Sequence, residues 1–226
     1  PINALDWSWH APDRLVTCAE DCRFFVWDLR QQQPAQSLLA PASWTSSVKW
    51  APLNDVMLAT GHADSICIWD IRSSTQHMSV LAPGQARVLG VDWSPRNKDR
   101  LLSVSMEHTP AKKSGAIKVW DVSSAGKVHD SIDIEDGCPY DARFLPFGGP
   151  AILASVESSV VVFQLEGGSA RRAKVVQTFD GHAGPVSSLG FAPIDGENSA
   201  EWRIVTFSAA ERCLRSWKYE LSRDFQ

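Results

Sequence analysis

The sequence has no long apolar run and no excess of basic residues, and each absence excludes a class of protein. No segment of about 18 residues is apolar throughout, which is the length a membrane-spanning helix needs. The formal net charge is −4 and the pI is near 5.9, whereas a nucleic-acid-binding surface usually shows a marked basic excess. We therefore expect no direct membrane insertion and no binding to nucleic acid.

The five cysteines are an odd number and lack the regular spacing of a disulfide framework. This usage is typical of a reducing compartment such as the cytosol or nucleus. Cys18 and Cys22 form a close pair, but a metal site would need further ligands at suitable spacing. We expect ordinary buried thiols in strands, and no metal.

Catalytic motifs are also missing. The sequence has no glycine-rich phosphate loop, no G-x-S-x-G turn and no paired carboxylates in a predicted pocket. An acidic cluster at Asp133, Glu135 and Asp136 is interpreted as a solvated loop. The sequence therefore predicts a protein that is not an enzyme, with no cofactor and no small-molecule substrate.

The chain is rich in tryptophan, with ten residues against two tyrosines. Three tryptophans begin Trp-Asp dipeptides that follow short apolar segments, and two weaker copies of the pattern end in Phe163 and Trp217. The dipeptides are Trp27-Asp28, Trp69-Asp70 and Trp120-Asp121. The five aromatic positions recur at about the 40–45-residue period of a four-stranded propeller blade, with insertions in two repeats.

A second motif, aromatic-x-Pro, recurs once in each repeat, ahead of the Trp-Asp position. Each copy ends a short predicted strand, because proline has no N–H to donate to the sheet. The copies begin at Trp50, Trp93, Phe144 and Phe191, and a looser one runs from Trp9 to Pro12. Longer distances in the third and fifth repeats place polar insertions near 106–113 and 194–201, which we expect between strands.

These repeats predict an all-β fold, a WD-repeat β-propeller with five recognisable blades of four-stranded antiparallel sheet. Flat tryptophan rings would fill the space between stacked blades. The expected blades cover about residues 1–42, 43–85, 86–136, 137–181 and 182–226. WD-repeat propellers most often have seven blades, so we expect this chain to be part of one. The closing blades would lie outside this segment, or a partner would supply one.

The repeat also implies a buried hydrogen-bond chain in each blade, linking a histidine, a Ser or Thr, an acid in a tight turn and the tryptophan. The fifth repeat is nearly complete. The expected structural residues are Asp21, Trp27, Trp69, Asp70, Trp120, Asp121, His182, Ser208, Glu211 and Trp217. His182 with Ser208 and an acid could be taken for a catalytic triad, but the repeat explains the same residues as buried structural groups.

With the repeats in phase, the chain resembles the amino-terminal propeller of the WD-repeat subunits in the SEA complex, called GATOR in animals. The most distinctive segment is Ala142 to Gly148, where the family has Ala-Arg followed by Pro-Phe-Gly. Segments of the first, second and fifth repeats are similar as well. Tyr140 stands where a tryptophan is usual in the family.

The resemblance implies a non-catalytic scaffold that binds the other protein subunits of a complex and regulates the TOR kinase in response to amino acids. It also implies a cytoplasmic protein, held at the vacuole or lysosome surface through that complex. Arg143 is a candidate partner contact if it is exposed, or else a core salt-bridge or cation–π residue. Lys112 and Lys113 form a small basic loop that is either solvated or used for docking.

An adaptor of another assembly, such as a ubiquitin-ligase substrate receptor or a chromatin adaptor, is the alternative. A deep charged pocket built from residues of several blades would favour it.

Overall fold

The computed structural model describes residues 1–31, 33–39, 44–73, 79–82, 86–109, 112–123, 127–134, 137–146, 150–165, 173–193 and 201–220. Within these ranges the chain forms nineteen β-strands in five antiparallel sheets, each built from strands that follow one another in the sequence. No helix in the described part is long and apolar enough to cross a membrane.

Each sheet is one blade, and blades are numbered here in chain order. Blade 1 comprises β1 (Ile2–Trp7), β2 (Arg14–Ala19), β3 (Arg23–Asp28) and β4 (Pro34–Leu39). Blade 2 comprises β5 (Thr45–Trp50), β6 (Met57–His62), β7 (Ile66–Asp70) and β8 (Ser79–Leu81). Blade 3 comprises β9 (Arg87–Trp93), β10 (Arg100–Thr109), β11 (Lys112–Asp121) and β12 (Lys127–Ile134).

The last two blades follow the same order. Blade 4 comprises β13 (Pro139–Phe144), β14 (Ala151–Val156), β15 (Ser159–Leu165) and β16 (Ala173–Phe179). Blade 5 has three strands in the described residues, β17 (Ser188–Pro193), β18 (Glu201–Ser208) and β19 (Cys213–Glu220). The all-β propeller with five blades that the repeats predict is confirmed.

Apolar side chains on both faces of a sheet drive the blades to stack. In β3, Phe24 and Val26 are buried on one face, while Phe25 and Trp27 occupy the other, because successive side chains of a strand point to opposite sides. A sheet with two apolar faces needs a neighbour on each.

Four clusters of buried residues fill the four junctions between consecutive blades. The cluster of blades 1 and 2 includes Val16, Phe24, Val48 and Trp69, and the Phe24 ring meets the Trp69 ring edge-on at 4.8 Å between centroids. The other three clusters join blades 2 and 3, blades 3 and 4, and blades 4 and 5. The core is therefore divided into layers between blades, and tryptophans help to fill them as expected.

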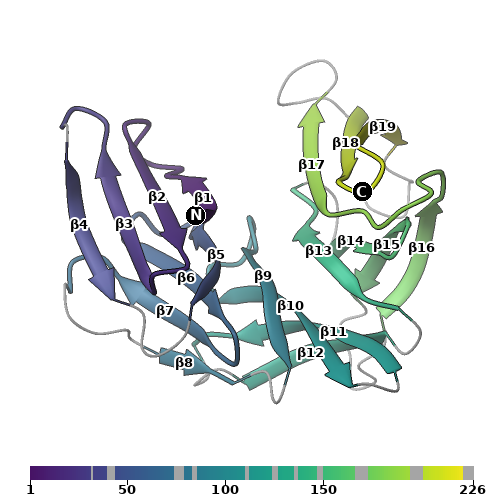
Figure 1. Ribbon diagram of the computed structural model, residues 1–226, viewed down its shortest axis with the longest axis horizontal. Helices are drawn as coiled ribbons and strands as arrows, with labels where there is room; N and C mark the ends of the chain where they lie inside the picture. The colour runs from purple at the N-terminus through teal and green to yellow at the C-terminus, as the bar shows by residue number, and fades with distance from the viewer. Residues whose placement is uncertain are drawn as a thin grey trace.

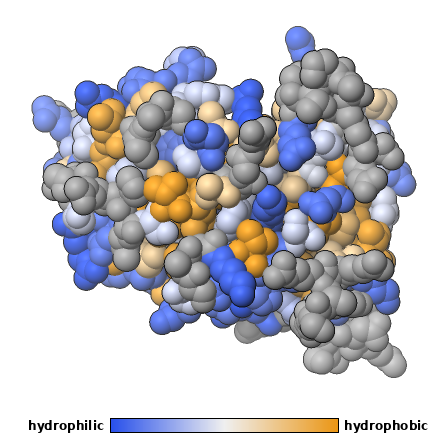
Figure 2. All heavy atoms as spheres, turned by 90° about the horizontal axis from the view of Figure 1, so that it is seen from below, coloured by the Kyte–Doolittle hydropathy of each residue, from blue (hydrophilic) through white to orange (hydrophobic). Residues whose placement is uncertain are grey.

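The five blades follow one another around an arc, and the inner strands β1, β5, β9, β13 and β17 line its concave side (Figure 1). Blades 1 and 5 face each other across the open side of this arc (Figure 1). Each keeps exposed apolar side chains, among them Leu5 and Trp7 on β1 and Leu214 on β19. Elsewhere, the view from below shows apolar patches interspersed with hydrophilic ones (Figure 2). A seven-bladed ring stays a prediction.

Two local expectations were wrong. The insertion near 106–113 does not lie between strands; it lengthens β10 and β11, which pair from Arg100↔Asp121 to Thr109↔Lys112. The residues pair with each other and so satisfy their backbone groups within the hairpin. In blade 1 the aromatic at the end of the inner strand is Trp7, which pairs with Leu15 as Trp50 pairs with Leu58. Trp9 therefore occupies the place of the proline. The expected insertion at 194–201 lies almost wholly outside the described residues.

Candidate functional site

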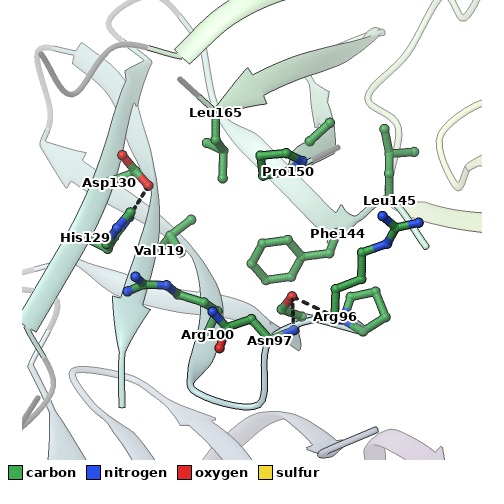
Figure 3. Close-up of a pocket in the computed structure, with 13 residues that line it drawn as sticks. Arg96, Asn97, Arg100, Val119, His129, Asp130, Phe144, Leu145, Pro150 and Leu165 are labelled. Carbon is green, nitrogen blue, oxygen red and sulfur yellow. Dashed lines mark hydrogen bonds and ion pairs between the residues drawn. The ribbon is translucent and has the colours of Figure 1, made fainter. Parts of the chain in front are cut away.

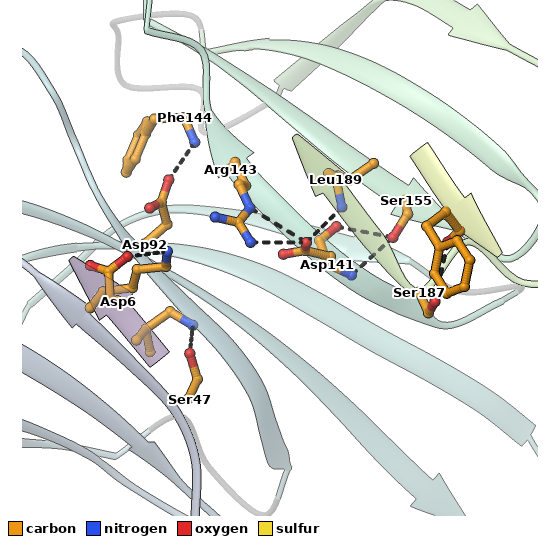
Figure 4. A network of polar contacts seen from close by, with 12 residues as sticks. Asp6, Ser47, Asp92, Asp141, Arg143, Phe144, Ser155, Ser187 and Leu189 are labelled. Atoms are coloured by element: carbon orange, nitrogen blue, oxygen red, sulfur yellow. Dashed lines mark hydrogen bonds and ion pairs between the residues drawn. The ribbon is translucent and has the colours of Figure 1, made fainter. Parts of the chain in front are cut away.

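The inner strands are joined by side chains that each accept a backbone N–H from the next blade (Figure 4). Asp6 Oδ2 accepts from the amide of Trp50 at 2.8 Å, and Asp92 Oδ2 accepts from the amide of Phe144 at 2.9 Å. These two acids stand immediately before the aromatic residue that ends their own strand. They connect blade 1 to blade 2 and blade 3 to blade 4.

The other two junctions use an acceptor two residues earlier in the strand. Ser47 Oγ accepts from the amide of Val91 at 3.3 Å, and Asp141 Oδ2 accepts from the amide of Leu189 at 3.0 Å. In these blades the residue before the aromatic is a base, Lys49 in β5 and Arg143 in β13. The inner strands of blades 1 to 4 thus alternate between acid and base at one position, where β17 has Gly190. Each of the four junctions keeps one hydrogen bond of this kind.

This alternation brings charges of both signs to the concave side of the arc. Lys49 Nζ lies 2.8 Å from Asp6 Oδ1, and Arg143 Nη2 lies 3.4 Å from Asp141 Oδ2. Both pairs are largely buried, so they are screened by salt less than surface pairs. Burial opposes the charge of Arg143, but the carboxylates of Asp141 and Asp92 outweigh it and raise the pKa of Arg143.

Asp92 differs from the other acids of this group. Burial raises the pKa of its carboxyl to about 6, even though Arg143, Lys49 and the Phe144 amide all favour the charged form. The described residues offer it no ion pair within 4.0 Å. Its carboxylate is therefore the least compensated of the group, and such groups cluster at functional sites.

Four of these charged residues, Asp6, Lys49, Asp92 and Arg143, line a pocket of about 410 Å³, which we call the axial pocket. It draws residues from all five blades: Asp6 and Trp9 from blade 1, Lys49 from blade 2, Asp92 from blade 3, Arg143 from blade 4 and Trp202 from blade 5. Further walls come from the aromatic-x-Pro residues at the ends of the inner strands. The pocket combines apolar rings with a few polar groups, as binding sites commonly do.

The sequence-predicted partner contacts have different positions. Arg143 is part of the axial pocket and also forms the salt bridge with Asp141, so both of its expected roles are compatible with the structure. Lys112 and Lys113 are the first two residues of β11, and their side chains lie outside the described part. Asp6, Lys49 and Asp92 were missed. Their common place before the aromatic residue in successive repeats is a signal that could have identified them.

The three Trp-Asp tryptophans, and Trp217 at the same position of blade 5, each donate a hydrogen bond to a hydroxyl on the second strand of their own blade. The donor and acceptor pairs are Trp27 with Thr17 at 2.8 Å, Trp69 with Thr60 at 2.7 Å, Trp120 with Ser103 at 2.8 Å and Trp217 with Thr206 at 3.0 Å. In every case the hydroxyl lies two residues after the cross-strand partner of the tryptophan. In blade 4 the same positions hold Phe163 and Ala154, so the donor and the acceptor are both replaced by apolar groups.

Histidine joins this network in two blades. In blade 5, Nε2 of the buried His182 lies 2.8 Å from Thr206 Oγ1, and Nδ1 lies 3.6 Å from Glu211 Oε2. Ser208 does not take the expected place: Thr206 is the shared hydroxyl, and the Ser208 Oγ makes no hydrogen bond. The register of β18 against β19 explains this, since Trp217 pairs with Ile204. Ser208 is too far along the strand.

In blade 2 the histidine comes from the sheet itself. Nε2 of His62, at the end of β6, lies 2.8 Å from the Thr60 hydroxyl that also accepts from Trp69. His62 occupies the strand position that Ser208 occupies in blade 5. The histidine that bonds the shared hydroxyl therefore comes from the second strand in blade 2 and from the segment before the inner strand in blade 5. In both blades the histidine is buried and serves the tryptophan network.

The expected acidic residues lie at turns and strand ends. Asp21 Oδ1 accepts from the Arg23 amide at 3.1 Å in the turn before β3. Asp70 accepts from Arg72 Nε at 2.9 Å, and this hydrogen bond lowers the pKa of Asp70. Asp121 Oδ2 lies 3.0 Å from Arg100 Nη1. These contacts are local and structural.

A second pocket, of about 300 Å³, lies between blades 3 and 4 (Figure 3). Phe144, Leu165 and Pro150 form apolar walls, and Arg100 and His129 stand at one side. His129 Nδ1 contacts Asp130 Oδ2, and Arg100 pairs with Asp121. His129 and Arg100 thus have charged partners among their neighbours, whereas the axial pocket holds an acid without one, so the axial pocket is the better candidate site.

The cysteines and other possible metal ligands do not come together in the described residues, where no group of three or more His, Cys, Asp or Glu could hold a metal ion. Cys18 and Cys67 are buried in strands, and burial raises the pKa of each thiol to about 11. Both are therefore protonated and unreactive at neutral pH.

No family model matches the chain, but several curated proteins are similar to it in sequence over nearly its whole length. A WD repeat-containing protein of Dictyostelium discoideum is 30% identical over 223 residues, which cover 97% of this chain and 12% of that protein. The GATOR2 complex protein Wdr59 of Drosophila melanogaster is 26% identical over 227 residues, and WDR59 of Homo sapiens is 26% identical over 239 residues. Each of these matches covers 97% of this chain and 22% of the relative. The chain thus spans less than a quarter of the length of these relatives.

A solved structure shows the same fold. One chain in the crystal structure of the mitotic checkpoint complex matches with a TM-score of 0.76 at 17% identity, over 97% of this chain and 62% of that chain. At this identity the likeness shows the fold alone. The repeats, the blade networks and the relatives agree: the chain is a WD-repeat β-propeller whose sequence resembles the GATOR2 complex protein WDR59 along nearly its whole length.

Proposed function

We propose that the chain is the propeller of a non-catalytic scaffold subunit in a GATOR2-type complex. The observation that carries this proposal is the similarity to GATOR2 WDR59 proteins of fly and human over 97% of the chain. The structure supports it, because the tryptophans, histidines and hydroxyls of the repeat form hydrogen bonds within their own blades. Its partners would be the other protein subunits of the complex.

The complex would regulate TOR kinase signalling in response to amino acids. The propeller would take part through recognition by exposed side chains and pockets on its faces, with no bond made or broken. His182, the residue most like a catalytic base in the sequence, is buried and bonded to Thr206. This arrangement supports a structural role. We place the protein in the cytoplasm, peripheral to the vacuole or lysosome through its complex.

Affinity purification of the full-length protein from its native cells tests this proposal. We expect the other subunits of a GATOR2-type complex to co-purify in stoichiometric amounts, and amino-acid starvation to change TOR activity less in cells that lack the protein. Co-purification of an unrelated assembly, or of no protein at all, would contradict the proposal. Fractionation of the same cells tests the location.

A second candidate function rests on the axial pocket. A charged pocket built from all five blades favours a receptor that takes a peptide segment, such as a ubiquitin-ligase substrate receptor or a chromatin adaptor. The same purification separates the two candidates, because a cullin adaptor or histones would be recovered in place of GATOR2-type subunits.

A further inference from the structure

One acid of the axial pocket, Asp92, has no ion-pair partner in the described part of the chain. Two carboxylates, Asp6 and Asp92, and two cations, Lys49 and Arg143, line the pocket, and a third carboxylate, Asp141, contacts Arg143 from outside the lining. Lys49 is paired with Asp6 at 2.8 Å and Arg143 with Asp141 at 3.4 Å. In the described residues no cation lies within ion-pair distance of Asp92. One negative charge is therefore left without a direct partner.

Asp92 is also fixed in position. Its Oδ2 accepts a hydrogen bond from the Phe144 amide at 2.9 Å, across the junction of blades 3 and 4. Figure 4 shows this hydrogen bond. No other donor in the described part of the chain bonds to the carboxylate, and Asp92 lines the axial pocket. A carboxylate held in this way needs no reorganisation to receive a ligand, which favours binding.

The pocket walls suit the stem and head of a basic side chain. Trp50, Trp93, Phe144 and Phe191 line the pocket, and so does Trp9, which is 70% exposed. A guanidinium or ammonium group is attracted to aromatic faces, most strongly where water is excluded. The volume of about 410 Å³ is near the low end of ligand pockets, which admits a side chain but not a folded element.

We propose that the axial pocket binds a basic side chain, arginine or lysine, from a segment of a partner protein, with Asp92 as its counter-charge. The cation would supply the ion pair that Asp92 lacks, and the aromatic rings would hold the aliphatic stem. An acidic side chain fits less well, because it would meet Asp92 while Lys49 and Arg143 are already paired. The inference rests on the proposed function only in that the partner is a protein.

Saturation-transfer NMR on the full-length protein measures this directly, using Nα-acetyl-arginine amide and Nα-acetyl-lysine amide as probes. The citrulline amide is the matched neutral probe, and Nα-acetyl-aspartate amide is the acidic one. We expect the basic probes to bind at least tenfold more tightly than citrulline. Preference for the acidic probe, or equal binding of arginine and citrulline, would overturn the proposal.

The variant Asp92→Asn assigns the site. Its amide oxygen can still accept from the Phe144 N–H, so the junction is kept, and we expect binding of the basic probes to fall at least tenfold. Asp64→Asn, in the turn after β6, is the matched control and should bind as the unchanged protein does. Undiminished binding by Asp92→Asn would contradict the proposal.

A measurement on the unchanged protein tests the same assignment even if the Asp92→Asn variant does not fold. Binding of the arginine probe to the unchanged protein should weaken severalfold from pH 7.5 to pH 5, as Asp92 gains its proton. Binding that is unchanged over this range would contradict the assignment. These measurements use the protein alone, so their outcome is independent of which proteins co-purify with it.

Discussion

At the scale of single residues, the blades depend on shared hydroxyls. Thr60 accepts from the indole of Trp69 and also bonds His62, and all three side chains are buried. A buried donor that loses its acceptor is costly, whereas replacing both partners by apolar groups can be nearly neutral. Blade 4 shows the second outcome, with Phe163 and Ala154 in these two positions.

Thr60→Val tests the value of the shared hydroxyl. Valine keeps the shape of threonine but removes the hydroxyl to which Trp69 Nε1 and His62 Nε2 bond, so we expect a loss of about 2–4 kcal/mol in the free energy of unfolding. Thr60→Ser keeps the hydroxyl and should lose about 1 kcal/mol. Denaturant titration of both variants checks this. Equal losses would show that the hydroxyl is unimportant.

Asp92 gives a pH-dependent prediction at the same scale. Its pKa is about 6 in the folded protein and about 4 in an unfolded chain. Between these values the folded state binds more protons than the unfolded state, so this group makes stability fall as pH rises from about 4 to 6.

Asp92→Asn should therefore remove that fall and stabilise the protein at pH 7.5, by on the order of 1–3 kcal/mol. Thermal unfolding of both proteins across pH 4–7.5 measures it. A variant that is less stable at pH 7.5 would show that Asp92 is adequately compensated. If Asp92→Asn both raises the stability and abolishes binding, Asp92 lowers stability but is needed for function, as is common at binding sites.

At the scale of elements, the repeat predicted strands and their order, but not their register or their length. The aromatic-x-Pro and Trp-Asp motifs mark strand ends. Proline has no N–H to donate to the sheet, and the tryptophan packs at a fixed place between neighbouring blades. The shared hydroxyl depends on which residues face each other across two strands, so Thr206 could not be separated from Ser208 by spacing alone. The insertion near 106–113 looked like a loop because its residues are polar, yet polar residues are suited to a hairpin that extends beyond the other strands.

Gly115 in β11 shows how closely blades 3 and 4 approach. A β-carbon there would lie 2.4 Å from Cδ of Pro139 and 2.6 Å from the Ser105 carbonyl oxygen. We expect Gly115→Ala to lower the free energy of unfolding by about 1–3 kcal/mol. Gly90 in β9 is the matched control, since a β-carbon there would meet no heavy atom within 4 Å. Denaturant titration should find Gly90→Ala neutral or slightly stabilising; similar losses in both variants would contradict this view of the junction.

At the scale of the whole molecule, the blades are joined by their apolar layers and by hydrogen bonds between inner strands, one of which at each junction runs from a backbone N–H to a side chain of the preceding blade. The layers follow from the repeat, because each blade carries apolar residues on both faces. The axial pocket does not follow from it in the same way, since Asp6, Lys49, Asp92 and Arg143 meet only when the inner strands gather at the centre of the arc. Of these four, only Arg143 was a candidate contact on the evidence of the sequence.

Asp141 tests the connection of blades 4 and 5. Asp141→Ala would leave the Leu189 amide and the partly buried Arg143 without their acceptor, and we expect a loss of about 3–5 kcal/mol. Hydrogen exchange should quicken most in β17, where Leu189 lies. Asp133→Ala, at an exposed position of β12, should leave exchange in β17 unchanged. An equal effect of both substitutions would show that the junction does not depend on Asp141.

Cross-linking mass spectrometry of the purified native assembly tests the central claim most directly, because it locates the contacts of this propeller. If the protein is a scaffold, we expect cross-links from residues of several blades to other protein subunits of a GATOR2-type complex. One of these cross-links should join a residue near the axial pocket to a partner segment that bears a basic residue. Cross-links confined to the protein itself, or formed with an unrelated assembly, would contradict the account and leave the propeller fold as its remaining conclusion.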